Sequence, residues 1–366
     1  MNVNFYMPTK VIMGLGCVIN QKESMRGLGK KAMLVTGKNS AKANGSQEDV
    51  IQVLTGMGID YVVYDQVMSN PTIDCVYEGA ALAKKEQVEF IISIGGGSPM
   101  DAGKAIALLA AQEVTRENLF SGQYEQKVLP MVHIPTTAGT GSEVTPYAIL
   151  TNDQAQSKTS MASSVLFPTI AYCDPTYMKS LSKTVTINTA IDALSHAVEG
   201  MLSKRATILT DALAKESIGY LMQNVEALKA GSLSPEQRGD LLYASTLAGM
   251  VIAHTGTTAV HSMGYSLTYF RDIDHGRANG LLLANFMRFV EKSNDTLIQR
   301  ILSSMSLTSV DQFAKELEEL LGEKESLSDE EIESFASIAF NAKNIINCAV
   351  IPSKEDLIDI YKVSLG

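Results

Sequence analysis

The residues best suited to chemistry begin with an aspartate and a histidine in the second half of the chain. The stretch IDALSHAVEG, residues 191–200, places Asp192 and His196 four residues apart, so a helix would put both on one face. Taken alone, such a pair is usually exposed and contributes roughly a few tenths of a kcal/mol to stability. The spacing by itself leaves a surface pair and a functional site as alternatives.

Two further histidines make the second alternative chemically specific. His261 falls on a predicted helix, and His275 lies at a predicted loop or helix start. Together with Asp192 and His196 they would supply one carboxylate and three imidazoles, which suits a divalent first-row metal. Each histidine taken singly is more often structural or solvated, so the four-residue metal site is a hypothesis.

The remaining two of the five histidines have weaker claims. His133 lies in a predicted strand, and we expect it to be structural. His254 precedes His261 by about two helical turns, but Gly256 between them makes one continuous helix doubtful. His254 is therefore a candidate for lining a pocket or for catalysis, and it is not expected to bind metal.

A run of three glycines joins a predicted strand to a predicted helix in the first half. In IISIGGGSPMDAGKA, residues 91–105, Ser98 stands where an N-cap belongs and Pro99 where a helix begins. Glycines let a ligand approach the backbone, and the helix N-terminus offers free N–H groups to a phosphate. The G-x-G-x-x-G fingerprint is not met, because Met100 occupies the last glycine position. A pyrophosphate site and a plain tight turn both remain possible.

A second loop of small polar residues follows the next predicted strand. IPTTAGTGSEVT, residues 134–145, is rich in hydroxyl groups and glycine, which suits contacts to a sugar, an amide or a phosphate. An ordinary polar loop is the alternative. Two such loops at the ends of neighbouring parallel strands favour one shared ligand.

The elements that must position these residues differ between the halves of the chain. In the first half, strands predicted at 30–37, 59–65, 88–95 and 128–137 alternate with helices, two of them at 72–87 and 100–111. This alternation predicts a Rossmann-like parallel sheet covered by helices. In the second half, helices are predicted at 186–201, 205–228, 235–253, 277–292, 308–321 and 328–344. Ser328 and Glu331 predict a capping box for the last. We expect an α/β dinucleotide-binding domain over residues 1–180 and an all-helical metal-binding domain over residues 181–366.

Composition narrows the class of partner. A chain of 366 residues predicts about two domains, and a net charge of −10 disfavours nucleic acid and acidic membranes. The four cysteines form no C-x-x-C pair, which favours reduced thiols in the cytoplasm. The N-terminal residues do not resemble a signal peptide, and no apolar run approaches the roughly 20 residues of a membrane span. We expect a small-molecule ligand and a cytoplasmic protein, and leave a homodimer open.

Six sequence blocks in the same order resemble the iron-containing alcohol dehydrogenases, which share their fold with glycerol dehydrogenase and dehydroquinate synthase. The blocks are NPT (70–72), GGGSPMDAGKA (95–105), IPTTAGTGSEVT (134–145), DP (174–175), DALSHAVE (192–199), and HSMGY with DHGRANG (within 261–280). The resemblance covers essentially the whole chain. It implies the two domains already expected, with the active site in a cleft between them.

The resemblance also implies roles for individual residues. The implied metal ligands are Asp192, His196, His261 and His275, with Fe²⁺ as the usual metal and Zn²⁺ in some relatives. His261, His275 and, more weakly, His254 are the catalytic candidates. The cofactor-binding candidates are Gly37, Asn39, Ser40, Asn70, Gly96, Gly97, Ser98, Asp101, Thr136, Thr137, Thr140, Thr145, Lys158 and Met178.

Two positions depart from the family pattern. Tyr265 stands where members often carry another histidine, so a proton relay through that imidazole is in doubt. Gly37 stands where members that prefer NAD tend to carry an acid that holds the ribose 2′-OH. Without that carboxylate, Lys38, Asn39 and Ser40 could donate to a 2′-phosphate. We therefore expect NADP(H) in preference to NAD(H).

The expected function is hydride transfer between NAD(P)(H) and a small primary alcohol or aldehyde. One alternative is a polyol oxidoreductase of the glycerol dehydrogenase kind, and another is a carbon–oxygen lyase of the dehydroquinate synthase kind. A non-catalytic nucleotide-binding protein of the same fold is a third. The presence of all four implied metal ligands argues against the non-catalytic alternative.

Overall fold

The computed structural model describes residues 3–366, which divide into two compact units. One unit is Met7–Leu181, and the other consists of Ser182–Gly366 together with residues 3–6. The boundary expected between residues 180 and 181 lies next to the structural one, although residues 3–6 belong with the second unit. The expected position of the active site relative to the two domains stays a prediction.

A six-stranded parallel sheet, in the order β1-β8-β5-β4-β2-β3, forms the centre of the first unit. The strands are β1 (Lys10–Met13), β2 (Lys31–Thr36), β3 (Asp60–Tyr64), β4 (Phe90–Gly95), β5 (Met131–Pro135) and β8 (Ile170–Cys173). Every residue of β4 and β5 is buried, as expected for parallel strands that are covered on both faces. The predicted Rossmann-like domain is confirmed.

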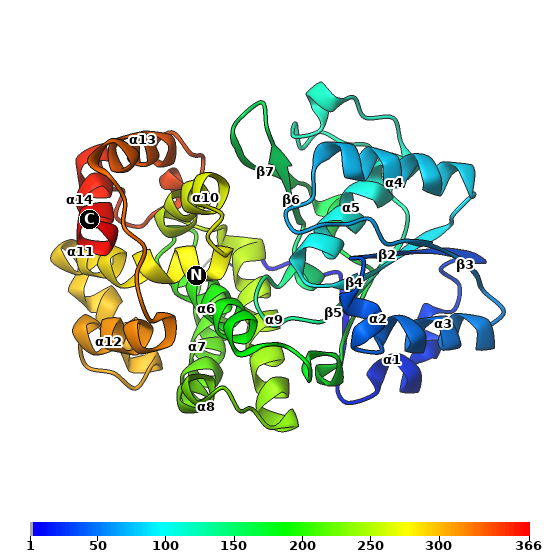
Figure 1. Ribbon diagram of the computed structural model, residues 1–366, viewed down its shortest axis with the longest axis horizontal. Helices are drawn as coiled ribbons and strands as arrows, with labels where there is room; N and C mark the ends of the chain where they lie inside the picture. Colours follow the sequence, from blue (N-terminus) through cyan, green and yellow to red (C-terminus); the bar gives the residue numbers. More distant parts are fainter. Residues whose placement is uncertain (1–2) are drawn as a thin grey trace. The chain divides into compact units, whose positions relative to one another are not determined.

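Helices cover both faces of this sheet (Figure 1). They are α1 (Cys17–Asn20), α2 (Ser40–Ala43) and α3 (Ser46–Gly56) on one face, and α4 (Ile73–Lys85) and α5 (Gly97–Ala111) on the other. Successive strand residues point to opposite faces. Met33 and Ile91 accordingly belong to the core under α4 and α5, whereas Leu34 and Ile92 belong to the core under α1 and α3.

An antiparallel hairpin stands apart from the sheet. It consists of β6 (Tyr147–Asn152) and β7 (Ser157–Ala162), and it was not predicted from the sequence. β1 and β8 were also missed, because four-residue strands give too short a pattern to recognise. Short 3-10 helices complete the element list: η1 (Lys22–Met25), η2 (Arg116–Asn118), η3 (Ser142–Val144), η4 (Ser164–Leu166), η5 (Pro175–Met178) and η6 (Ile345–Asn347).

The second unit is helical, as predicted. Its helices are α6 (Lys183–Met201), α7 (Ile208–Gln223), α8 (Val225–Ala230), α9 (Pro235–Thr255), α10 (Ala259–Arg271), α11 (His275–Ser304), α12 (Val310–Leu321), α13 (Asp329–Phe340) and α14 (Lys354–Leu365). α6 packs against α7, α9 and α11. Every residue from Ala190 to Met201 is buried, so α6 is a central helix.

Some predicted helix limits were wrong. The helix expected over 205–228 is two helices, because the chain leaves helical geometry at Asn224. The helix expected at 277–292 begins at His275 and continues to Ser304, with non-helical dihedral angles at Asn294. The capping box of Ser328 and Glu331 is confirmed, but α13 ends at Phe340 and not at residue 344.

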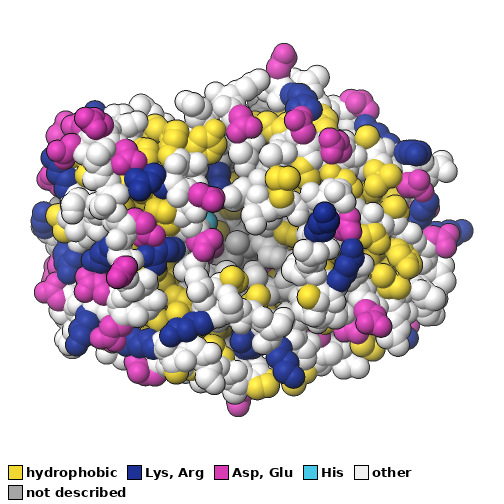
Figure 2. All heavy atoms as spheres, viewed as in Figure 1, with side chains coloured by type: hydrophobic (Ala, Val, Ile, Leu, Met, Phe, Trp, Pro, Cys, Tyr) yellow, Lys and Arg dark blue, Asp and Glu magenta, His cyan; other side chains and the backbone are white. Residues whose placement is uncertain are grey.

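Figure 2 shows Lys and Arg side chains interspersed with Asp and Glu side chains on the face in view. Within residues 3–366, none of the helices combines the length and the apolar composition that crossing a membrane requires.

Candidate metal centre and cofactor site

Asp192 and His196 lie on the buried central helix α6. Asp192 is 3% exposed and His196 is 5% exposed, so the surface-pair alternative is wrong. Burying a carboxylate and an imidazole without partners costs several kcal/mol, on the order of 2–7 for a neutral polar group alone. The surroundings of this pair must therefore supply compensating interactions.

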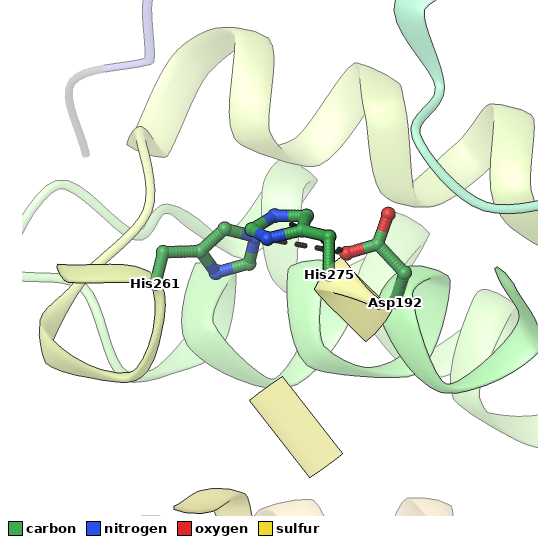
Figure 3. A group of neighbouring side chains, drawn as sticks. All are labelled: Asp192, His261 and His275. Atoms are coloured by element: carbon green, nitrogen blue, oxygen red, sulfur yellow. Dashed lines mark ion pairs between the residues drawn. The ribbon is translucent and has the colours of Figure 1, made fainter. Parts of the chain in front are cut away.

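Three imidazoles converge on one carboxylate oxygen. Asp192 Oδ1 lies 3.8 Å from the Nε2 atoms of His196, His261 and His275. The ligand atoms of Asp192, His261 and His275 all lie within 4.8 Å of one another. Figure 3 shows these three side chains pointing toward one another from α6, α10 and the start of α11. The His196 and His261 rings stack with centroids 4.7 Å apart.

This arrangement fits a metal ion. Two ligand atoms that each lie about 2.0–2.2 Å from one ion are at most about 4.4 Å apart. The 3.8 Å spacings from Asp192 Oδ1 fall within that range. Neutral imidazoles and a carboxylate are donors that suit both iron and zinc. The three distances from Asp192 and the donor types therefore suit a divalent first-row metal, while His196 lies outside the three-residue group whose ligand atoms are all within 4.8 Å of one another.

Glu199 holds one of these imidazoles from behind. It is fully buried on α6, and its Oε2 accepts a hydrogen bond from Nδ1 of His261. Because a carboxylate accepts, Nδ1 carries the proton and Nε2 keeps its lone pair on the side of Asp192. No role was predicted for Glu199, although it follows Asp192 by two helical turns on the same face.

Asn279 also belongs to the group and was missed. Its Nδ2 lies 3.2 Å from Asp192 Oδ1, 3.2 Å from His261 Nε2 and 3.4 Å from His275 Nε2. Asn279 follows His275 by one helical turn on α11. That spacing was the available signal, but an amide is not a metal ligand of the expected type and was passed over.

Electrostatics keep the carboxylates of the group ionised. Burial by itself raises the pKa of Asp192, but the surrounding histidines and the Asn279 amide outweigh it, so the pKa lies below its usual value. Burial likewise opposes ionisation of Glu199, and His261 and Thr258 overcome it, which lowers that pKa. Burial lowers the pKa of His261, but Glu199 and Asp192 more than reverse this effect.

His254 and Tyr265 lie differently with respect to this group. The Nε2 of His254 accepts a hydrogen bond from the Tyr6 N–H at 3.0 Å, and its Nδ1 lies 2.7 Å from the Met250 carbonyl. Phe5 stacks on the His254 ring with centroids 4.0 Å apart. Both ring nitrogens of His254 thus have hydrogen-bond partners, and a catalytic role for His254 stays a prediction. Tyr265 stacks on His275 with centroids 5.4 Å apart.

In the first unit, most of the cofactor candidates lie at one edge of the sheet. β2, β4, β5 and β8 end at this carboxyl edge, and the order β8-β5-β4-β2 makes them neighbours. The residues that follow these strands include Gly37, Asn39 and Ser40 after β2, Gly96, Gly97 and Ser98 after β4, Thr136, Thr137 and Thr140 after β5, and Met178 after β8. This edge is where parallel sheets bind ligands.

The run of glycines at residues 95–97 (the glycine turn) contacts the loop of small polar residues at 134–145 (the threonine loop). A Cβ on Gly96 would lie 3.0 Å from Thr137 Oγ1, and one on Gly97 would lie 2.7 Å from Thr140 Cγ2. A Cβ at either position would therefore press against the threonine loop, more severely at Gly97 than at Gly96. The shared ligand expected for these two loops stays a prediction.

The expected N-cap of α5 was wrong. The helix begins at Gly97 with Gly96 as its N-cap, so Ser98 and Pro99 lie inside the first turn. The left-handed φ of 150° at Gly95 lets the chain turn directly out of β4, two residues earlier than expected. Among the described residues, no side chain caps this helix, which leaves its first N–H groups for a ligand.

Asn70, Ser98 and Lys158 form a second contact group. Asn70 adopts a left-handed φ of 58°, and its N–H donates to Ser98 Oγ at 3.2 Å. Lys158, on β7, donates from Nζ to Asn70 Oδ1 at 2.6 Å. Three candidates far apart in the sequence therefore lie together.

Lys104 is a fully buried amine that was not among the predicted site residues. Its Nζ donates to Ser142 Oγ at 2.8 Å, Thr145 Oγ1 at 3.2 Å and the Tyr147 carbonyl at 2.7 Å. Burial lowers the pKa of Lys104 to about 8. Asp101, one turn earlier on α5, accepts from Ser142 Oγ at 2.6 Å, so Asp101 and Lys104 together fix the threonine loop.

His133 lies near this group in β5 and is fully buried. Burial, reinforced by the charge of Lys104, holds the pKa of His133 well below its usual value. The ring therefore stays neutral, in agreement with a structural role.

Comparison with known proteins gives the class of the protein. Two family models match, "Iron-containing alcohol dehydrogenase" over residues 8–175 and "Fe-containing alcohol dehydrogenase family, C-terminal" over residues 186–365. The chain is 35% identical to the 1,3-propanediol dehydrogenase of Klebsiella pneumoniae over 290 residues, which is 79% of this chain and 73% of that protein. It is 32% identical to the NAD-dependent methanol dehydrogenase of Bacillus methanolicus over 288 residues, 78% of this chain and 75% of that protein.

A solved structure agrees over almost the full length. The iron-containing alcohol dehydrogenase from Thermotoga maritima matches with a TM-score of 0.92 at 39% identity, over 99% of each chain. The fold and these matches define an oxidoreductase of the alcohol dehydrogenase type. The chain belongs to the iron-containing alcohol dehydrogenase family. The resemblance drawn from the sequence is confirmed, and the roles of individual residues stay predictions.

Proposed function

We propose that the protein transfers hydride between a nicotinamide dinucleotide and a small primary alcohol or its aldehyde, with a divalent metal at the Asp192 group. The observation that carries this proposal is the convergence of three imidazole nitrogens at 3.8 Å from one buried carboxylate oxygen. This donor set occurs in a chain of the iron-containing alcohol dehydrogenase family.

In this proposal the four side chains bind the ion and keep it in place. When bound, the metal supplies Lewis acidity toward the alcohol or carbonyl oxygen. Asp192 supplies negative charge, and Asn279 donates to it so that its orientation is fixed. His196, His261 and His275 supply neutral nitrogen donors, two of them almost fully buried, so bulk water is kept from most of the group. None of these residues acts as a covalent nucleophile.

The cofactor is assigned to the carboxyl edge of the sheet. The uncapped N-terminus of α5 offers N–H groups to a pyrophosphate, and Gly96 and Gly97 allow close approach. Asn70, Thr137, Thr140 and Lys158 would supply further polar contacts. The methanol dehydrogenase relative is named as NAD-dependent, which supports a nicotinamide cofactor.

We further propose NADP(H) in preference to NAD(H). Gly37 follows β2 and carries no carboxylate that would repel a 2′-phosphate, and Lys38 and Ser40 beside it can donate to one. NAD(H) is the competing cofactor, since the methanol dehydrogenase relative is named as NAD-dependent. Isothermal titration with NADPH and NADH tests it, and tenfold tighter binding of NADH would contradict it.

The substrate class rests on the relatives. 1,3-propanediol and methanol, in the names of two of them, are small primary alcohols. Glycerol is the alternative, in line with a polyol oxidoreductase. Initial rates on short primary alcohols and on glycerol separate the two, because a polyol enzyme should prefer glycerol. The free, buried cysteines support a reducing compartment, and we propose a cytoplasmic location.

Metal analysis of anaerobically purified protein is the decisive test. We expect about one ion per chain, iron rather than zinc, since four protein ligands plus a substrate oxygen need at least five positions. His261→Ala should lose the ion and the activity while the helical circular dichroism is kept. Retained metal together with normal turnover in that variant would refute the proposal.

A further inference from the structure

We propose that Glu199 is a positioning residue that fixes the ring and the tautomer of His261, so that Nε2 presents its lone pair toward the Asp192 group. The inference rests on the proposed metal function for its purpose, but its geometry stands independently. Figure 3 shows His261 beside Asp192 and His275. Glu199 contacts Nδ1 of this ring, whereas Nε2 is the nitrogen that lies 3.8 Å from Asp192 Oδ1.

The two oxygens of Glu199 have separate partners. Oε1 accepts from the Thr258 N–H at 2.8 Å, the Thr258 hydroxyl at 2.6 Å and the His261 N–H at 3.3 Å. Oε2 accepts from the His261 imidazole through Nδ1. Glu199 therefore caps the start of α10 with one oxygen and holds the imidazole with the other.

The capping contacts explain why an amide at position 199 cannot make the same contact with His261 as the carboxylate does. Thr258 is the N-cap of α10, and its own side chain does not cap the helix. The backbone N–H groups of Thr258 and His261 can only donate, so whatever replaces Glu199 must keep an acceptor on that side. In Glu199→Gln the amide oxygen must stay at the helix start, which turns the amide NH₂ toward His261 Nδ1.

A donor facing Nδ1 reverses the proton arrangement of the ring. A neutral imidazole carries one proton, so Nδ1 would become the acceptor and Nε2 would carry the hydrogen. An Nε2–H group cannot bind a metal ion. The proton must first move from Nε2 to Nδ1, and the free energy of that change weakens metal binding. Substituting residues that orient a metal-binding histidine typically lowers metal affinity by about 10- to 100-fold.

A matched control isolates this effect from helix capping. Thr258→Val removes the hydroxyl contact to Oε1 but keeps the backbone N–H and the approximate volume of the side chain. If Glu199 only stabilises the start of α10, Glu199→Gln and Thr258→Val should lose similar amounts of Zn²⁺ affinity. If Glu199 positions His261, the tautomer of the His261 ring should change in Glu199→Gln and not in Thr258→Val.

The first measurement is the tautomer of His261 in metal-free protein. Histidine-selective ¹⁵N labelling gives spectra from only five rings, and loss of one set in His261→Gln assigns the signals. At pH 9, we expect Nδ1–H in wild type and Thr258→Val and Nε2–H in Glu199→Gln. An unchanged Nδ1–H form in Glu199→Gln would overturn the proposal.

The second measurement is Zn²⁺ affinity, by competition with a chromophoric chelator. We expect Glu199→Gln to bind Zn²⁺ about 10- to 100-fold more weakly than Thr258→Val. Equal affinities in these two variants would overturn the proposal. Absence of Zn²⁺ and Fe²⁺ binding in wild type would refute the proposed metal function instead, and the tautomer result would still decide the role of Glu199.

Discussion

Replacing Gly276 with alanine should force apart the two helices that carry Asp192 and His275. Gly276 follows His275 at the start of α11, and a Cβ there would lie 1.8 Å from the Asn188 carbonyl oxygen. The same Cβ would lie 3.0 Å from Asp192 Cβ. Because the closest atom is backbone, no side-chain rotation relieves the overlap, and α6 and α11 must separate.

The required movement can be compared with the spacing of the ligands. Ordinary contacts of a carbon atom are about 3.5 Å or longer, so relieving the 1.8 Å overlap needs a shift of roughly 1.7 Å. Added to the 3.8 Å between His275 Nε2 and Asp192 Oδ1, that shift exceeds the separation of about 4.4 Å that one ion can bridge. Overpacking costs about 1–3 kcal/mol, and alanine regains about 1 kcal/mol of helix propensity. A rigid backbone clash belongs at the upper end, so we expect a net loss of about 2 kcal/mol.

Gly219→Ala is the control, because a Cβ there, inside α7, meets no described atom within 4 Å. It should stabilise the protein by up to about 1 kcal/mol. Urea unfolding followed by circular dichroism gives both stabilities, and chelator competition gives both Zn²⁺ affinities. If Gly276→Ala matches Gly219→Ala in both measurements, the close approach of α6 and α11 does not set the ligand spacing, and the reasoning fails.

Two further predictions concern stability. Burial lowers the pKa of Lys104 to about 8, whereas its ordinary value is 10.5, so the unfolded chain binds the proton more tightly and stability rises with pH through this window. Between pH 7.5 and 9.5 the free energy of unfolding should rise by up to about 2 kcal/mol, and the urea midpoint of Lys104→Met should not show this rise. If the urea midpoints of wild type and Lys104→Met depend equally on pH, Lys104 is not the group responsible. Ser328→Ala removes the confirmed capping box of α13 and should cost about 1 kcal/mol in urea unfolding, while the exposed Ser303→Ala should cost almost nothing.

The sequence was sufficient to predict that the glycine turn and the threonine loop lie at neighbouring strand ends. Gly96 and Thr137 follow neighbouring strands, and the carboxyl ends of parallel strands meet at one edge, so contact between the loops follows from topology alone. The start of α5 was not predictable, because three consecutive glycines accept several turn geometries. The sequence suggested Ser98 as the cap, but the backbone at Gly95 allowed an earlier start.

The residues that support the ligands could not be predicted. Glu199 contacts His261 across 62 positions, and Asn279 contacts Asp192 across 87 positions. Helical spacing shows which residues share a face, but it does not show which other helix that face meets. The four ligand candidates were found because one carboxylate and three imidazoles form a recognisable donor set for a divalent metal, whereas Glu and Asn occur commonly on helix surfaces.

The contact of Phe5 and Tyr6 with His254 has a consequence for the order of folding. These two residues leave the ribosome about 250 positions ahead of their partner, since 248 positions separate Tyr6 from His254. Met7–Leu181 contains its own sheet and cores and can fold during synthesis, as domains generally do. The helical unit acquires its N-terminal segment only after α9 has been made. A polypeptide that starts at Ser182 would lack the Phe5 ring that stacks on His254, and in the nascent chain this contact is likewise missing until residues 5 and 6 reach α9.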